Sequence, residues 1–230
     1  MGKRLVLWDI DKTLLDVDDI GFEIFSAAFA RFTGLTDHID TRGPGRTEWR
    51  WFNETLDANG LTATPGDFSR FLELQHAEFS ARASELTMRG RILPGAKEVL
   101  HRCANEADIV SSLLTGNTRA NAELKLTTFD LHELVSFPFG GYGDDHPERC
   151  ELVHIARRRV YESTGVEFTP DTTVLIGDSP NDIRAAHDGG ARVVAVATGV
   201  TDAATLQAAG ATVVVPDLSD TDAVMSAVLG

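Results

Sequence analysis

The sequence predicts an α/β protein in which a parallel sheet carries an all-helical insert after its first strand. Two patterns in the 230-residue chain support this prediction. From about residue 91 onward, short apolar segments alternate with segments of helical periodicity, which is typical of a parallel sheet with right-handed crossovers. Between residues 16 and 90, apolar residues recur at helical spacing only. We therefore expect an α/β core formed by residues 1–15 and 91–230 and a helical cap formed by residues 16–90.

The expected elements follow in order along the chain. The first strand, residues 5–8, is short and apolar and ends in acids. Helices of the insert are expected around residues 22–32, 48–56 and 67–86, separated by the turn signals RGPGR, ANG and TPGD. Further strands are expected at 108–114, 135–139, 173–177, 192–197 and 212–215, with helices at 96–104, 118–127 and 147–164 and after residues 180, 197 and 215.

Composition argues against several classes of protein. Hydrophobic residues make up 43% and charged residues 24% of the chain, an ordinary globular balance, and no apolar stretch is long enough to cross a membrane. The net charge of −14 argues against a nucleic-acid partner, because such a partner requires a basic patch. The two cysteines form no CxxC pair, and the N-terminal segment lacks the long apolar region of a signal peptide. We therefore expect a cytoplasmic protein, a monomer or a homodimer.

Acidic and polar residues collect where predicted strands end. Strand by strand they are Asp9 and Asp11, then Thr115, Gly116 and Asn117, then Asp178 and Asp182. Because ligands of open parallel sheets bind beyond the carboxyl ends of the strands, we expect these groups to converge. Converging carboxylates repel one another unless a cation compensates, and oxygen ligands without clustered His or Cys favour Mg²⁺. A DxD pair alone also fits turn residues and helix caps, but DxDxT together with a later GDxxxD favours a metal site.

Three segments resemble signature motifs of the haloacid dehalogenase-like superfamily. DIDKTL at 9–14 is similar to the first signature, LLTGN at 113–117 to the second and IGDSPND at 176–182 to the fourth. The insert falls where one class of this superfamily carries its cap. The resemblance implies a Rossmann-like core with an inserted helical cap, Mg²⁺ as cofactor, and phosphatase activity on a small phosphorylated metabolite.

The resemblance also implies roles for the acids. Asp9 would attack phosphorus to form an aspartyl-phosphate, and Asp11 would protonate the leaving oxygen and later activate water. Mg²⁺ would be held by the Asp9 carboxylate, the Asp11 main-chain carbonyl and Asp178. Asp182 would support the site from behind.

Phosphate binding is expected at the second signature. The Thr115 hydroxyl and the main-chain N–H groups of Gly116 and Asn117 would donate to phosphate oxygens at the start of a helix. Asn117 fits the role of a helix cap equally well, and the two roles are compatible.

The third signature, a cation that neutralises the phosphate and the nucleophile, has no direct counterpart. The family often places a Lys-Pro pair where this chain has GYGDDHPERCELV, which contains no lysine. Elimination among the four lysines leaves Lys125, on the helix that follows the second signature, and Arg149 is the positional substitute. The alternative for Lys125 is an ordinary solvated helix lysine.

Missing features disfavour three sister activities. A dehalogenase does not need Asp11, a phosphonatase needs a cap lysine that residues 16–90 lack, and a transport ATPase needs transmembrane helices. A phosphomutase of the β-phosphoglucomutase type remains open, as does a non-catalytic sensor protein. Arg42 and Arg46, in a Gly/Pro-rich loop, could grip a substrate carboxylate or second phosphate, or could balance cap acids. Chain length and cap position resemble phosphoglycolate phosphatases.

Overall fold

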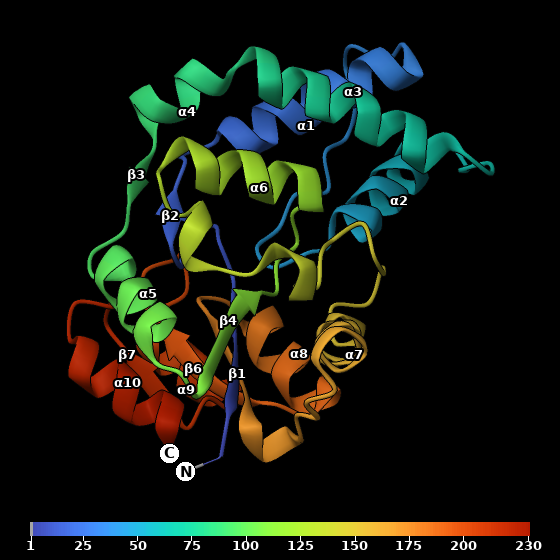
Figure 1. Ribbon diagram of the computed structural model, residues 1–230. Helices are drawn as coiled ribbons and strands as arrows, with labels where there is room; N and C mark the ends of the chain where they lie inside the picture. The colour runs from blue at the N-terminus through green and yellow to red at the C-terminus, as the bar shows by residue number, and fades with distance from the viewer. Residues whose placement is uncertain (1) are drawn as a thin grey trace.

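The computed structural model describes residues 2–230 and has a five-stranded sheet at its centre (Figure 1). The strand order is β4-β1-β5-β6-β7, which places the first strand between β4 and β5. The strands are β1 (Arg4–Trp8), β4 (Ile109–Leu113), β5 (Thr173–Gly177), β6 (Arg192–Val196) and β7 (Val213–Val215). All neighbouring strands are parallel, which confirms the predicted α/β class.

Helices cover both faces of the sheet, because the side chains of each strand alternate between two apolar layers. Val6 and Trp8 of β1 pack in one layer, and Leu5 and Leu7 pack in the other. The first layer includes buried residues of α5 (Ala96–Asn105), α6 (Arg119–Thr128) and α10 (Thr221–Leu229). The second includes those of α7 (Glu151–Thr164), α8 (Pro180–Gly189) and α9 (Ala203–Ala208). With both faces covered, the strand ends are the part of the sheet left for a ligand.

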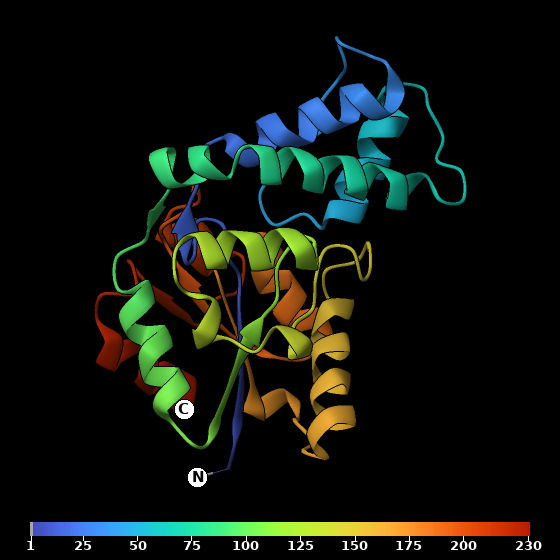
Figure 2. The ribbon, with the colours of Figure 1, turned by 45° about the horizontal axis from the view of Figure 1, so that its top comes forward.

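The insert forms four helices that lie across the carboxyl ends of the strands, as Figures 1 and 2 show. They are α1 (Ile20–Thr33), α2 (Glu48–Ala58), α3 (Asp67–Ala81) and α4 (Ala83–Arg89), which we call the cap helices. Six buried side chains among them form an apolar cluster of their own, namely Phe25, Ala28, Phe29, Phe52, Leu56 and Phe71. Helices α1, α2 and α3 therefore share a small core of their own, whereas Leu86 of α4 packs in the first layer of the sheet.

Two short strands mark the ends of the insert. These are β2 (Leu15–Asp16) and β3 (Arg91–Ile92), which pair with each other in antiparallel orientation. Strands of two residues are too short to produce an alternating pattern, so the sequence predicts neither of them. Their pairing brings the two connections between sheet and cap side by side.

The prediction of a strand at 135–139 is wrong. Phe137–Phe139 form a 3₁₀ turn, η2, and the following chain contacts the sheet through a single bridge between Leu114 and Gly141. Pro138 accounts for the difference, because it has no N–H to donate to a neighbouring strand. The remaining 3₁₀ turns are η1 (His132–Leu134) and η3 (Pro170–Thr172). None of the helices within residues 2–230 is long and apolar enough to cross a membrane.

Candidate active site

The carboxyl ends of three neighbouring strands bring the expected residues together. Asp9 directly follows β1, Thr115 lies just beyond β4, and Asp178 directly follows β5. Trp8, the last residue of β1, pairs with residues at the ends of both neighbouring strands, which places the three turns level with one another. The side chains of Asp9, Thr115 and Asp178 are all buried. Segments far apart in the chain therefore meet at one edge of the sheet.

Three buried carboxylates form a cluster at this edge. Oxygen atoms of Asp9, Asp178 and Asp182 all lie within 4.8 Å of one another. Burial, together with the charges of neighbouring carboxylates, outweighs the lowering effect of Arg149 and raises the pKa of Asp9 to about 7 and that of Asp178 to about 8. The positive charge of Arg149 is therefore too little to keep both Asp9 and Asp178 ionised, a shortage that a bound cation relieves.

Arg149 contacts this cluster directly. Its Nη2 donates to the Asp9 carboxylate at 2.9 Å and to Asp182 at 2.6 Å, and its Nε donates to Asp182 at 3.0 Å. Burial lowers the pKa of Arg149, but the charges of Asp182 and Asp9 outweigh it and hold the pKa above its usual value. Asp182 also accepts from the N–H and the hydroxyl of Ser179, at 3.0 and 2.6 Å, so it orients Arg149 from behind. Of the two cations that the sequence offers, Arg149 is the one beside Asp9.

Lys125 lies on α6 with its amino group against Asp11. Its Nζ donates to both carboxylate oxygens of Asp11 at 2.7 Å and to the side-chain oxygen of Asn117 at 2.8 Å. The Asn117 amide nitrogen donates in turn to Asp11 at 2.7 Å and to the Thr115 hydroxyl at 2.9 Å. The Lys125 side chain is only 3% exposed, so it is not a solvated helix lysine. The two cations are therefore divided between the two aspartates of the first signature.

Thr118, not Asn117, caps α6, and its side chain accepts from the N–H of Asn121. Asn117 is thereby left to contact Asp11, Lys125 and Thr115. Gly116 lies beside it under the cap, where a Cβ atom would stand 1.9 Å from the carbonyl oxygen of Arg46. The loop between α1 and α2, residues 34–47, is called the cap loop below. Only a glycine at 116 allows the cap loop to approach this closely.

Comparison with known proteins agrees with this geometry. The family model for haloacid dehalogenase-like hydrolases matches residues 6–187. The chain belongs to the haloacid dehalogenase-like hydrolases. No curated protein sequence matches it.

Solved structures of haloacid dehalogenase-like fold resemble the chain over nearly its whole length. A hydrolase from Pseudomonas syringae is 19% identical with a TM-score of 0.68, covering 97% of this chain and 98% of its own. A predicted phosphoglycolate phosphatase from Haemophilus somnus is 18% identical with a TM-score of 0.67, covering 97% and 98%. A candidate β-phosphoglucomutase from Bacteroides vulgatus is 19% identical with a TM-score of 0.69, covering 99% and 89%. At such identities the likeness shows the fold alone.

The acidic cluster fits the divalent cation that haloacid dehalogenase-like hydrolases generally use. Its donors are all carboxylate oxygens, which suit a hard ion such as Mg²⁺. Asp182 already uses both oxygens on Arg149 and Ser179, so Asp9 and Asp178 are the better ligands and Asp182 is the supporting group. The main-chain carbonyl of Asp11, expected as a further ligand, stays a prediction.

A cavity of about 300 Å³ lies between the acidic cluster and the cap helices. Asp9 and Asp178 lie on its sheet side, and Glu48 and Gln75 lie on its cap side. The sequence did not single out these two cap residues, because an acid in the first turn of a helix and a glutamine among polar helix residues are both ordinary. Glu48 is 7% exposed and Gln75 is 1% exposed. This burial results from the docking of the cap on the sheet, so the sequence alone does not indicate it.

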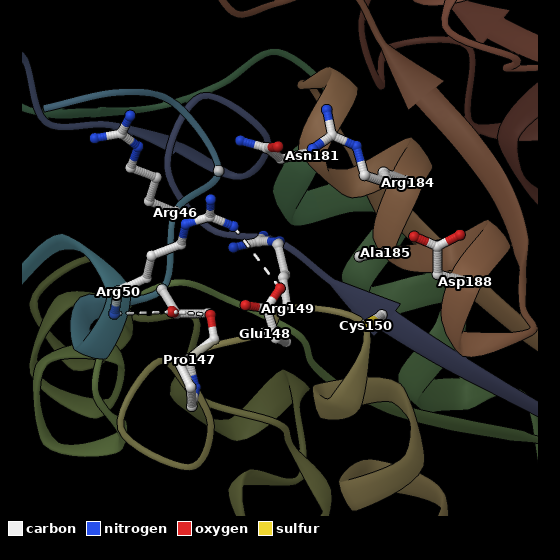
Figure 3. Close-up of a pocket in the computed structure, with 12 residues that line it drawn as sticks. Arg46, Arg50, Pro147, Glu148, Arg149, Cys150, Asn181, Arg184, Ala185 and Asp188 are labelled. Atoms are coloured by element: carbon white, nitrogen blue, oxygen red, sulfur yellow. Dashed lines mark hydrogen bonds and ion pairs between the residues drawn. The ribbon is translucent and has the colours of Figure 1, made fainter. Parts of the chain in front are cut away.

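Arg46 lies on the cap loop between this cavity and a second one of about 240 Å³, shown in Figure 3. The second cavity lies where the cap loop meets α8 and the segment that precedes α7. Arg46 forms an ion pair with Glu54 at 2.9 Å. Figure 3 shows a second ion pair, between Arg50 of the cap and Glu148 of the segment that precedes α7. Arg42 instead pairs with an acid on the cap surface, at 2.9 Å. Only Arg46 of the two predicted loop arginines therefore lines the cavity above the acids.

Proposed function

We propose that this chain is a Mg²⁺-dependent phosphatase that hydrolyses small phosphate monoesters through an aspartyl-phosphate. The observation that carries the proposal is the convergence of Asp9 and Asp178 in one buried cluster, beside Arg149 and facing a cavity of small-molecule size. Membership of a hydrolase family supports hydrolysis as the reaction. The fold also resembles that of a predicted phosphoglycolate phosphatase, which supports a phosphatase of that structural branch and leaves its substrate open.

The two aspartates of the first signature divide the chemistry. A carboxylate oxygen of Asp9 attacks phosphorus, the bond from phosphorus to the alcohol oxygen breaks, and Asp11 gives its proton to the leaving alkoxide. Asp11 then takes a proton from water, and the water oxygen attacks phosphorus and releases Asp9. One water is consumed, and one alcohol and one inorganic phosphate leave.

Neighbouring residues prepare these steps. Arg149 opposes the effect of burial and lowers the pKa of Asp9, which favours the ionised nucleophile. Thr115, Gly116 and Asn117 line the same cavity and would donate to the phosphate oxygens. Mg²⁺, when bound, supplies further positive charge against the developing charge on phosphorus.

A phosphate-release screen over small phosphate monoesters with Mg²⁺ tests the proposal. We expect wild-type activity and a loss of at least about 1000-fold in Asp9→Asn, because the amide is not a nucleophile toward phosphorus. The control is Asp171→Asn, on the surface before β5, which should keep wild-type activity. Full activity in a correctly folded Asp9→Asn protein would contradict the mechanism.

A phosphomutase is the second candidate, because it uses the same pair of aspartates and because the fold resembles that of a candidate β-phosphoglucomutase. The same screen separates the two activities. A hexose phosphate converted to an isomer without release of inorganic phosphate would support the mutase, whereas stoichiometric release of phosphate supports the phosphatase.

A further inference from the structure

Glu48 is a buried acid on the cap side of the cavity, and the reaction described above does not use it. It is the first residue of α2, and it is 7% exposed. Its main-chain N–H donates to the Gly116 carbonyl at 2.9 Å. This hydrogen bond holds the start of α2 against residues 115–117, which are expected to bind the phosphate. With the phosphoryl group at Asp9 on the sheet side, the alcohol part of a substrate would lie toward the cap side of the cavity, which Glu48 lines.

One oxygen of the Glu48 carboxylate has a partner that its neighbours orient. The Gln75 side-chain oxygen accepts from the Asn121 amide nitrogen at 2.9 Å, so the amide nitrogen of Gln75 is turned toward Glu48 Oε1 and donates to it. Asn121 is itself fixed in the first turn of α6, against His76 at 3.2 Å. This chain of amides orients the carboxylate without using its second oxygen.

The second oxygen, Oε2, faces the cavity without a partner. Among residues 2–230 no hydrogen-bond donor contacts Glu48 Oε2, and this atom is not among the buried polar atoms that are sealed off. A carboxylate oxygen is an acceptor only, so its complement in a ligand is a donor such as a hydroxyl group. Water can donate to this oxygen in the empty cavity, but a ligand that displaces the water without supplying a donor leaves the oxygen unpaired, so the cavity prefers ligands that supply one.

Among residues 2–230, every cation on this side of the cavity has an acidic partner, with which a carboxylate on the substrate would have to compete. The cations that line it apart from Arg149 are Lys12, Lys125 and Arg46, which are paired with Asp16, Asp11 and Glu54 respectively. A substrate carboxylate next to Glu48 would instead meet a second buried acid. Burial is the largest effect on Glu48 and outweighs the lowering by Gln75 and Lys125, which leaves its pKa raised to about 7, so the carboxylate form predominates above neutral pH.

We propose that Glu48 selects the alcohol part of the substrate by accepting a hydrogen bond from one of its hydroxyl groups. The preferred substrates are then phosphate monoesters of polyhydroxy alcohols, such as polyol and sugar phosphates, and phosphoglycolate is disfavoured. This inference rests on the proposed phosphatase function and narrows it. The likeness to a predicted phosphoglycolate phosphatase concerns the fold and does not oppose it.

Three substrates and one isosteric substitution test the inference. The value of kcat/KM is measured for glycerol 1-phosphate, phosphoglycolate and p-nitrophenyl phosphate, whose leaving group has neither hydroxyl donors nor a carboxylate. We expect wild type to prefer glycerol 1-phosphate over phosphoglycolate by at least about tenfold. In Glu48→Gln that preference should fall by roughly tenfold to hundredfold, the range for one hydrogen bond to a charged group, while p-nitrophenyl phosphate changes little.

The control is Asp57→Asn, which removes one acidic charge from the exposed side of the same helix and should leave the preference unchanged. A preference for phosphoglycolate in wild type, or an unchanged preference in a folded Glu48→Gln protein, would overturn the inference.

A binding measurement separates failure of this inference from failure of the phosphatase proposal. Calorimetry with Mg²⁺ compares the binding of glycerol 1-phosphate and phosphoglycolate to Asp9→Asn and to Asp9→Asn with Glu48→Gln. We expect the single variant to bind glycerol 1-phosphate more tightly and the double variant to lose that difference. Equal binding of the two ligands by the single variant would contradict the role of Glu48 whatever the wild-type activity shows.

Discussion

Two buried cations act on different aspartates of the site. Arg149 presents a planar fork to Asp9 and Asp182, a geometry that an ammonium group does not reproduce. Lys125 presents a point charge to both oxygens of Asp11 and to Asn117. Asp11 is 39% exposed at its side chain, so without Lys125 only the hydrogen bond from Asn117 would keep it from turning toward water. We infer that Lys125 is a positioning residue, which acts on the reaction through Asp11.

Lys125→Met tests this role, because methionine keeps the apolar stem and removes the charge. Alkyl phosphates need a proton on the leaving oxygen, so their kcat/KM should fall by roughly 100-fold to 10,000-fold, the contribution of general acid catalysis. p-Nitrophenolate leaves without a proton, so hydrolysis of p-nitrophenyl phosphate should fall by less than about tenfold. Steady-state kinetics on both substrates is the measurement.

Lys97→Met, on α5 and outside the cavity, is the control for loss of a lysine and should affect neither substrate. An equal loss on both substrates in Lys125→Met would assign Lys125 to phosphate binding or to the nucleophile instead.

At the scale of elements, the cap is held to the sheet by a few backbone contacts. The Asn181 side chain donates to the Pro44 carbonyl at 2.7 Å, and the Thr47 hydroxyl donates to the Pro147 carbonyl at 2.7 Å. Between them lies Gly45, in the left-handed region with φ of +66°. The cap loop therefore approaches α8 at a point where the chain has no side chain.

Gly45→Ala should push the cap loop away from α8. A Cβ atom there would lie 2.4 Å from the Ser179 hydroxyl oxygen and 2.7 Å from the Asn181 Cβ atom. Since a displacement of about 1 Å can cost 100-fold in rate, we expect kcat/KM to fall by at least roughly tenfold. Phosphate-release kinetics and a thermal melt of each variant are the measurements.

Gly60→Ala is the matched control, because Gly60 has a similar φ of +71° with nothing within 4 Å of its added Cβ atom. Both variants carry the same backbone strain, roughly 1–2 kcal/mol, and Gly45→Ala should lose additional thermal stability because only its Cβ atom clashes with α8. Equal activity in the two variants would show that docking of the cap loop does not limit the reaction.

The sequence predicted the elements whose patterns extend over several residues. The five strands of the sheet are expected because each is a short, largely apolar segment between helical segments. The sequence does not predict β2, β3 or the turn at Phe137–Phe139, because two residues or one proline decide them. In the site, the acids after β1 and β5 were predictable from the strand-end rule.

The rest of the site depends on side chains that meet only in the folded chain. Whether Lys125 or Arg149 contacts Asp9 depends on how far each side chain reaches. The burial of Glu48 depends on how the cap docks on the sheet. Spacing in the sequence encodes neither of these.

For the whole molecule, the acidic cluster reduces the stability of the folded state. The chain has a net charge of −14, and three of its acids lie buried together beside Arg149. Burial and mutual repulsion disfavour the ionised forms of Asp9 and Asp178, as their raised pKa values show. Functional sites commonly reduce stability in this way. A ligand that binds only the folded state raises the free energy of unfolding again.

Mg²⁺ should therefore stabilise the wild-type protein against heat. At a concentration 100 times its Kd, a ligand adds about 2.7 kcal/mol to the free energy of unfolding, which corresponds to a rise in Tm of roughly 5–10 °C for a chain of this size. Asp178→Asn should lose this response, and in the presence of a chelator its Tm should equal or exceed that of wild type, because one repelling carboxylate is gone. Asp171→Asn, an exposed change of the same kind, should keep the wild-type response to Mg²⁺. Thermal melts with Mg²⁺ and with chelator measure both effects, and an Asp178→Asn protein that Mg²⁺ stabilises as strongly as wild type would place the metal away from β5.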